Sequence, residues 1–383
     1  MINQHRLKNL LIELIRIDSL SRREHALAMR LKREMEELGA EAWIDDAGGK
    51  VEGNVGNLIA HFRGNSPGSS PILLSAHMDT VAPGEGVAPI VEGNILKTDG
   101  RTVLGGDDKS GIAIICEVLR AVKEKHLPCG DVDVVFTICE EVGLLGAKWL
   151  DVSRLRARAG LVLDSDSLGF LFIKAPAANR MDFHIHGLAA HAGVCPEKGI
   201  SAIKIAAEGI SQMKLGRIDA ETTANIGLVE GGVAVNVIPN SVRLKGEARS
   251  HSEEKLTQQT THMVRCLEEA ASRHALEIDG KLYHAGVEAK IERDYDRMEV
   301  ANDSPIARLV RAAGRNLGIA VKTRATGGGC DANIFNKKGL EVANLSTGMR
   351  EIHTVKEWLD FNDLYLSAQM VLEIVRLNAI GSV

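Results

Sequence analysis

The chain of 383 residues has few aromatic side chains, which make up only 3% of it. This scarcity argues against recognition of bases or sugars by stacking. No apolar run approaches the roughly 18 residues of a membrane-spanning helix, and the polar residues spread through positions 1–15 favour an amphipathic helix over a signal peptide. A net charge of −5 with interspersed signs argues against nucleic acid or an anionic membrane as a partner.

The cysteines are also unremarkable in spacing, because none of them forms a CxxC pair. They are Cys116, Cys129, Cys139, Cys195, Cys266 and Cys330. Most stand among apolar residues, which indicates reduced, buried thiols in a cytoplasmic protein. The content of 45% hydrophobic and 25% charged residues is ordinary for a globular protein. The length favours two domains over one.

Strands alternate with helices in the first and last parts of the sequence. Apolar runs at residues 72–76, 132–139 and 161–163 predict buried strands, and a helix is expected to follow Gly111. Each of these runs is followed by acidic or histidine side chains. The pattern predicts an α/β sheet whose site lies at the carboxyl ends of its strands.

The pattern changes between residues 176 and 294. Strand, helix, two strands, helix and strand follow one another here, which is the order of a ferredoxin-like α+β unit. We therefore predict an α/β domain built from residues 1–175 and 295–383. The second domain, residues 176–294, is inserted into it.

His77 and Asp79 stand where the first apolar run ends. Side chains alternate along a strand, so these two leave it on the same side. A metal-binding histidine usually donates its second ring nitrogen to a partner such as a carboxylate. A capping histidine beside an acid in a surface turn is the alternative.

Paired acids follow two other predicted elements. Asp107 and Asp108 come after two glycines and before a helix, where Asp108 can cap the helix and leave Asp107 free. Glu140 and Glu141 follow a strand, and adjacent carboxylates repel each other unless a cation or a proton intervenes. Each pair alone has an ordinary explanation, as a helix start or as a solvated pair.

Together with Asp164 and His353, these residues make a ligand set rich in oxygen and nitrogen and free of thiolate. Such a set suits zinc, with manganese or cobalt as alternatives. It has enough ligands for two metals that share a carboxylate, generate hydroxide near neutral pH and polarise a carbonyl. One of the two neighbouring glutamates is then left to act as general base.

At this point the sequence resembles the M20 metallopeptidases, and within them the tripeptidase T-like branch. The motifs that carry the resemblance run in order through nearly the whole chain: residues 75–80, 105–111, 140–143, 187–193, 234–239, 246–250 and 327–333, and His353. The resemblance implies a zinc-binding α/β domain that carries a small domain acting as a lid and as the contact of a homodimer.

The resemblance also implies a role for each residue of the site. One zinc is expected on His77, Asp107 and Asp164, and the other on Asp107, Glu141 and His353. Asp107 bridges the two, Asp79 orients His77, and Glu140 is the base. The peptide bond between Asp107 and Asp108 is expected to be cis.

The substrate contacts implied by the resemblance lie mainly in the inserted domain. His191 is expected to reach the active site of a partner subunit, and Asn236 and Arg249 to bind the substrate. Gly328, in a run of three glycines, would offer backbone donors. Cys330 departs from the family pattern, in which a small hydroxyl residue is expected. Without the resemblance, His191 would be a loop residue and Arg249 a solvated charge.

The leading hypothesis is a cytoplasmic dizinc exopeptidase that removes the N-terminal residue from short peptides, above all tripeptides. An N-acyl-amino-acid amidohydrolase or a carboxypeptidase is an alternative, because the same metals cleave any amide whose carbonyl reaches them. A non-catalytic peptide- or metal-binding protein is a third reading. It predicts a missing ligand or base, and the sequence lacks neither.

Overall fold

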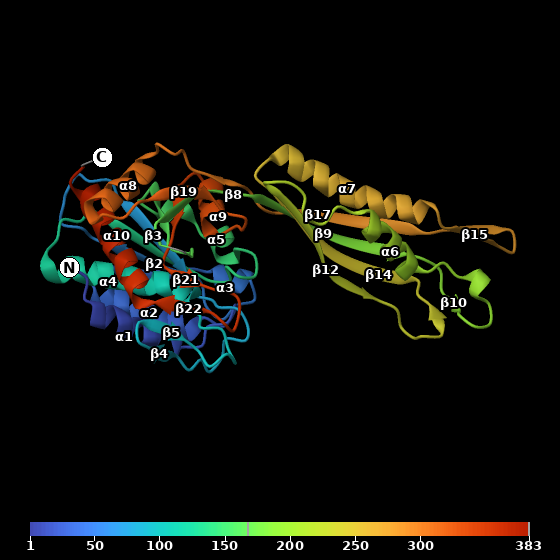
Figure 1. Cartoon of the computed structure of the whole chain (residues 1–383), viewed down its shortest axis with the longest axis horizontal. Helices are drawn as coiled ribbons and strands as arrows, with labels where there is room; N and C mark the ends of the chain where they lie inside the picture. The colour runs from blue at the N-terminus through green and yellow to red at the C-terminus, as the bar shows by residue number, and fades with distance from the viewer. Residues whose placement is uncertain (167, 382–383) are drawn as a thin grey trace. The chain divides into compact units, whose positions relative to one another are not determined.

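The computed structural model describes residues 1–166 and 168–381, and it divides into two compact units (Figure 1). The first unit contains Met1–Ala175, Met298–Thr326 and Cys330–Val383, and the second contains Pro176–Arg297 and Gly327–Gly329. The predicted fold class, an α/β unit with an inserted α+β unit, is confirmed.

The first unit mixes helices and strands along its length. Its helices are α1 (Gln4–Ile15), α2 (His25–Glu37), α3 (Ala47–Lys50), α4 (Gly106–Lys125), α5 (Leu145–Trp149), α8 (Pro305–Leu317), α9 (Asp331–Lys337) and α10 (Phe361–Ala379). Its strands are β1 (Glu41–Ile44), β2 (Leu58–Phe62), β3 (Ile72–His77), β4 (Ile90–Glu92), β5 (Ile95–Lys97), β6 (Val132–Thr137), β7 (Ala159–Val162), β8 (Phe170–Ala175), β18 (Met298–Glu299), β19 (Lys322–Ala325), β20 (Glu341–Leu345), β21 (Met349–Arg350) and β22 (Trp358–Asp360).

Strand β3 lies in the middle of the main sheet. Among the described residues this sheet has nine strands, in the order β1-β2-β6-β3-β7-β20-β8-β18 with β19 also paired to β8. Strand β3 runs parallel to β6 and β7, so that Leu74 is opposite both Val134 and Leu161. Every residue of β3 and β6 is buried, as expected of apolar runs covered on both faces. The carboxyl ends of these three parallel strands therefore meet at one edge.

Helices cover the main sheet, and a small sheet adds the loop that carries His353. Helix α4 packs against β3, with α1 and α10 beside it, whereas α9 contacts β7, β18 and β20 (Figure 1). In the described part of the chain, a four-stranded sheet has the order β21-β22-β5-β4. The loop between β21 and β22 contains His353.

The second unit is built around one antiparallel sheet. Its strands are β9 (Ala177–His186), β10 (Ala190–His191), β11 (Gly216–Arg217), β12 (Thr222–Gly231), β13 (Val237–Ile238), β14 (Ser241–Ser250), β15 (Ala275–Ile278), β16 (Lys281–His284) and β17 (Gly286–Tyr295), and its helices are α6 (Ala202–Gln212) and α7 (Glu253–Ser272). Within the described residues the main sheet has the order β11-β12-β14-β9-β17. The chain order of its four long strands, with α6 after the first and α7 after the third, is that of a ferredoxin-like unit.

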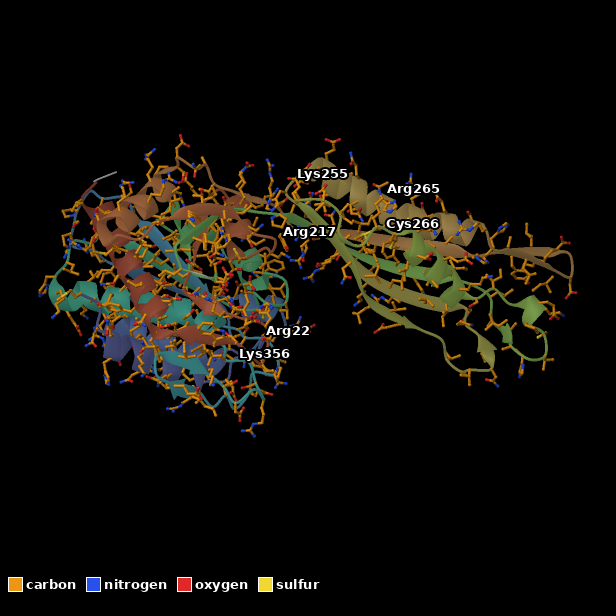
Figure 2. All side chains as sticks on the ribbon, viewed as in Figure 1. Arg22, Arg217, Lys255, Arg265, Cys266 and Lys356 are labelled. Carbon is orange, nitrogen blue, oxygen red and sulfur yellow. The ribbon has the colours of Figure 1, made fainter. Side chains whose placement is uncertain are left out.

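Helices α6 and α7 cover one face of this sheet, and among the described residues of this unit no helix lies on the other face, called here the open face (Figure 1). Phe183, Ile185 and Leu244 point into the core beneath the helices. Figure 2 shows the two sides of α7, where Arg265 is exposed and its neighbour Cys266 is buried in that core. At the start of α7, Lys255 Nζ lies 3.1 Å from Asp219 Oδ2 and 2.5 Å from Glu221 Oε1, which ties the helix to the segment before β12.

Candidate metal centre

The carboxyl edge of the main sheet collects the predicted metal ligands. His77 is the last residue of β3, the glutamate pair 140–141 follows β6, and Asp164 follows β7. Asp107 lies in the first turn of α4, and His353 comes from the loop after β21. His353 has a φ of 61°, a left-handed backbone that is uncommon for residues other than glycine. Such strained backbone occurs often where a side chain must be aimed at a functional site.

Asp107 lies between the two histidines of this group. Its Oδ1 is 3.1 Å from Nε2 of His77, and its Oδ2 is 3.1 Å from Nε2 of His353. His77 Nε2 is also 4.0 Å from Asp164 Oδ1, and His353 Nε2 is 2.9 Å from Glu141 Oε1. Two triads thus share one carboxylate: His77, Asp107 and Asp164, and Asp107, Glu141 and His353. The bond between Asp107 and Asp108 is cis, as expected.

These distances fit divalent metals. Bonds of about 2.0–2.1 Å in a tetrahedral zinc site separate the ligand atoms by about 3.3 Å. Burial raises the pKa of Glu140, Glu141 and Asp164 above their ordinary values, and the neighbouring carboxylates raise each of them further. Buried negative charge of this density is stable when protons or cations neutralise it. The donor set therefore suits two metal ions, with no thiolate among the ligands.

Neighbouring carboxylates favour the protonated form of the His353 ring. Hydrogen bonds to Asp107 and then to Glu141 raise the pKa of His353 to about 10, although burial opposes the shift. Burial alone would raise the pKa of Asp107, but the hydrogen bonds from His353 and His77 outweigh it and lower that pKa. A metal would take the place of the protons that now bridge these groups.

Metal loading is therefore expected to release protons and to strengthen as pH rises. At pH 7 the His353 ring, with a pKa of about 10, must lose a proton before it can bind a metal. Calorimetric titration of the metal-free protein with Zn²⁺, in buffers of different ionisation enthalpy, should count at least one proton released per chain. Affinity should rise between about pH 6 and 9. Zinc binding with no proton release at pH 7 would contradict this arrangement.

Asp79 positions His77 and the glutamate pair. The closer contact of His77 Nδ1 is the backbone carbonyl of Asp79, at 2.8 Å, whereas the Asp79 carboxylate is 3.5 Å away. That carboxylate accepts hydrogen bonds from the backbone N–H groups of Glu140 (2.9 Å) and Glu141 (3.2 Å) and from the hydroxyl of Ser21 (2.6 Å). Donation from Nδ1 leaves Nε2 of His77 available for a metal.

Glu357 belongs to the site, although the motifs did not reveal it. Its buried carboxylate accepts hydrogen bonds from the backbone N–H groups of Leu104 (2.8 Å), Gly105 (2.8 Å) and Asp107 (3.0 Å). Burial raises its pKa to about 7, against the opposing effect of these hydrogen bonds. Glu357 thus holds the loop that presents Asp107. A lone glutamate four residues after His353 carries no sequence signal for this role.

Replacing Glu357 by glutamine should loosen that loop. A glutamine offers one acceptor oxygen in place of two, so at least one of the three buried N–H groups loses its partner and the free energy of unfolding should fall by about 1–3 kcal/mol. Denaturant unfolding near pH 5, below the pKa of about 7, is the measurement, because the cost of burying the charge of Glu357 is small there. Glu351→Gln is the control, because Glu351 is an exposed residue of the same loop. Equal stability of the two variants would argue against the role of Glu357.

Cys330 lies next to the Asp164 segment. Nδ2 of Asn344 is 3.4 Å from the Cys330 sulfur, and Oδ1 of Asn344 accepts a hydrogen bond of 3.1 Å from the backbone of Asp164. Burial raises the pKa of the Cys330 thiol well above its ordinary value. The group is therefore a protonated thiol near neutral pH and a weak nucleophile.

The predicted substrate contacts of the second unit fall into two groups. The first is His191 with Asn236. The backbone carbonyl of Asn236 accepts a hydrogen bond of 2.9 Å from the backbone N–H of Ala192. Nδ1 of His191 accepts from the N–H groups of Gly193 (3.1 Å) and Val194 (3.2 Å), so Nε2 carries the ring hydrogen and is a donor.

The second group contains Arg249, near the end of β14, and the glycine run with Gly328. Arg249 Nη2 donates to Glu247 Oε2 at 2.9 Å, whereas its buried Nε has no hydrogen-bond partner among the described residues. Gly329 packs against the ring of Tyr295, where a Cβ would overlap the ring. A glycine is therefore required there.

An α/β sheet with two metal-ligand triads at its carboxyl edge and an inserted ferredoxin-like unit defines a metallopeptidase class. The sequence matches the model of peptidase family M20/M25/M40 over residues 73–377, and the chain belongs to this family. The predictions that the protein is an enzyme and a hydrolase of this family are confirmed. No helix in the described parts of the chain is long and apolar enough to cross a membrane.

Relatives place the chain near one branch of the family. It is 39% identical over 376 residues to the uncharacterised protein YqjE of Bacillus subtilis, covering 98% of this chain and 99% of YqjE. It is 37% identical to the aminopeptidase PepT of Bacillus cereus, with a TM-score of 0.87 and 99% of each chain covered. A tripeptidase of Staphylococcus aureus is 36% identical, with a TM-score of 0.92, and the match covers 99% of this chain and 100% of that one. The predicted resemblance to the tripeptidase T-like branch is thus confirmed.

Proposed function

We propose that this protein is a cytoplasmic dizinc exopeptidase that releases the N-terminal residue of tripeptides and similarly short peptides. The observation that carries the proposal is the carboxylate of Asp107, whose two oxygens lie 3.1 Å from His77 and from His353. Asp164 completes the triad that contains His77, and Glu141 completes the triad that contains His353. The likeness to PepT and to a tripeptidase supports the choice of substrate.

Each metal has its ligands in this scheme. One zinc is held by His77, Asp107 and Asp164, and the other by Asp107, Glu141 and His353, with Mn²⁺ or Co²⁺ as possible replacements. When bound, the metals polarise the scissile carbonyl and make a water more acidic. Glu141 is assigned as the ligand of the pair because its Oε1 is 2.9 Å from His353 Nε2.

Glu140 is the proton carrier of the reaction. It accepts a proton from the attacking water and delivers it to the leaving amine. Its carboxylate is buried, and burial raises its pKa well above the ordinary value, which suits a base that must also act as an acid. The Asp79 carboxylate accepts a hydrogen bond of 2.9 Å from the backbone N–H of Glu140, and this bond positions the base.

Arg249 and Gly328 bind the far end of the peptide. The unpartnered Nε of Arg249 and the rest of its guanidinium can form a two-point contact with the terminal carboxylate of the substrate. A Cβ at Gly328 would meet no atom within 4 Å, so a ligand has room to approach this part of the glycine run.

His191 and Asn236 act in a partner subunit, within a homodimer formed through the second unit. Nε2–H of His191 is a donor suited to the carbonyl oxygen that becomes negative during the reaction. Around it Val194, Val233 and Val235 are exposed by 76%, 86% and 106%. Exposed apolar side chains grouped in this way are typical of a contact surface.

A panel of matched substrates tests the proposal. A free tripeptide should be hydrolysed fastest, with its N-terminal residue released, and its N-acetylated form should not be cleaved. Amidation of the carboxyl end should weaken binding through loss of the contact with Arg249. Product analysis separates the alternatives, because release of the C-terminal residue would make the protein a carboxypeptidase. Preference for an N-acyl amino acid would make it an amidohydrolase. Glu140→Gln is the control for contaminating peptidases.

A further inference from the structure

A separate group of metal-binding side chains lies on the second unit. It consists of His184 and His186 on β9 and Glu288 on β17, whose ligand atoms all lie within 4.8 Å of one another. None of the three belongs to the triads at the edge of the main sheet or to the proposed substrate contacts. We call these residues the β9–β17 cluster.

The strand register gathers these side chains on the open face of the sheet. Phe183 and Ile185 alternate with the histidines along β9 and are fully buried under the helices, so His184 and His186 point to the other side. Their rings lie with centroids 4.0 Å apart. Glu288 is directly opposite His184 in the pairing of β17 with β9.

His186 has space for a ligand beside it. Its neighbours across the sheet are Gly286 on β17 and Ser241 on β14, both small residues. A Cβ at Gly286 would meet no atom within 4 Å. The position opposite His186 on β17 therefore carries no side chain that would fill the space beside the ring.

The ring nitrogens are arranged as metal ligands. Nε2 of His186 lies 3.3 Å from Glu288 Oε1, yet it is buried and has no hydrogen-bond partner among the described residues. About 3.3 Å is also the separation of two ligand atoms around a tetrahedral zinc. Ser241 Oγ lies 2.7 Å from Nε2 of His184 and can accept its hydrogen, which leaves Nδ1 of that ring for a metal.

Nearby cations do not oppose a metal at this place. Arg243 stands opposite His184 on β14, but its guanidinium is engaged by Asp182, with Nε 2.7 Å from Oδ1. Lys290, two residues after Glu288, lies 2.6 Å from Glu292. Both positive charges are therefore paired with carboxylates that the cluster does not use.

We propose that the β9–β17 cluster binds one divalent transition-metal ion, of the zinc, copper or nickel type. Two imidazoles and one carboxylate favour these ions over Mg²⁺ and Ca²⁺, which prefer oxygen ligands alone. The three side chains supply three positions of a four-coordinate site, and water supplies the last. The ion would link strand β17, at the edge of the sheet, to β9.

Metal counting on the full-length protein tests this site. After titration with Zn²⁺ and removal of excess, the wild type should hold one more equivalent per chain than His186→Asn or Glu288→Gln. Hydrolysis of a tripeptide should be unchanged in both variants. His284→Asn, which changes an exposed histidine of β16, is the matched control and should keep the wild-type metal content. The test compares the zinc content of the wild type with that of each variant. The result therefore does not depend on whether the site on the main sheet binds two metals.

A spectroscopic measurement identifies the ligands. Cu²⁺ added to the wild type should give an electron paramagnetic resonance signal with coupling to two nitrogens from this cluster, and His186→Asn should remove that component. Glu288→Gln alters a side chain that is 79% exposed, so it provides a variant whose folding should be unaffected. Equal zinc content in the wild type and in both folded variants, or retention of the copper signal in His186→Asn, would overturn the proposal.

Discussion

Glutamine in place of Glu140 should lower peptide turnover by about 10²–10⁴-fold and leave both metals bound. The amide keeps the size of the side chain and its capacity for hydrogen bonds, but it cannot take a proton from water. The backbone contact from Glu140 N–H to Asp79, at 2.9 Å, does not depend on the side chain, so the loop should stay in place. Rate and metal content, the latter by elemental analysis, must be measured on the same preparation.

Glu141→Gln is the matched control, because it makes the same chemical change one residue away. Glu141 Oε1 lies 2.9 Å from His353 Nε2, and a neutral amide is a poorer ligand than a carboxylate for a divalent cation. This variant should lose one metal and regain part of its activity in excess zinc, whereas Glu140→Gln should regain none. If Glu140→Gln loses a metal and Glu141→Gln keeps both, the roles of the two glutamates are reversed.

The grouping of the candidate metal ligands could be predicted because these residues stand at the ends of strongly apolar strands. The run before His77 and the run before Glu140 are buried at every position, as their composition indicated. Asp108 also behaves as its motif suggested, since its Oδ1 accepts a hydrogen bond of 3.1 Å from Gly111 N–H at the start of α4. That interaction leaves Asp107 free to face both histidines.

Other contacts depend on positions that only the folded chain defines. Glu357 is about 250 residues from the loop that it holds, as the sequence separation of its bond to Asp107 shows, and no local pattern marks such a contact. Asp79 was expected to orient His77 through its carboxylate, yet its carbonyl is nearer, at 2.8 Å. A backbone acceptor has no residue type by which a sequence could reveal it.

The sequence patterns do not predict strand β8 of the main sheet or helix α9. Strand β8 contains the apolar residues Phe170–Ile173, which are a strand signal, but they lie just before the change of pattern at Pro176. Helix α9 has only seven residues and follows three glycines, which are typical of a turn. The side chain of Asn333, the third residue of this helix, caps it: its Oδ1 accepts a hydrogen bond of 3.0 Å from the backbone N–H of Cys330.

The dimension of the second unit gives a physical reason for a shared active site. His191 and Asn236 lie beside the start of β14, whereas Arg249 lies near its end. The eight residue-to-residue steps from Ser241 to Arg249 span about 26 Å at the rise of a strand. An extended tripeptide is about 10 Å long. This separation is longer than the substrate, which favours the proposal that His191 acts in a partner subunit.

Two inactive variants should consequently restore each other when their subunits are mixed. His191→Ala removes a donor to the developing negative charge, with an expected loss of about 10²–10³-fold, and Glu140→Ala removes the base. A mixed dimer has one site with Glu140 from the first variant and His191 from the second. Random exchange makes half the dimers mixed, each with one of two sites intact, so about a quarter of wild-type activity should return.

A second pair of variants separates this result from general stabilisation by mixing. Arg249 is assigned to the same subunit as the base that it serves, so dimers of Arg249→Ala with Glu140→Ala contain no complete site and should stay inactive. Mixed dimers can be isolated with a different affinity tag on each subunit. Inactive mixed dimers of His191→Ala with Glu140→Ala would show that His191 does not act across the dimer.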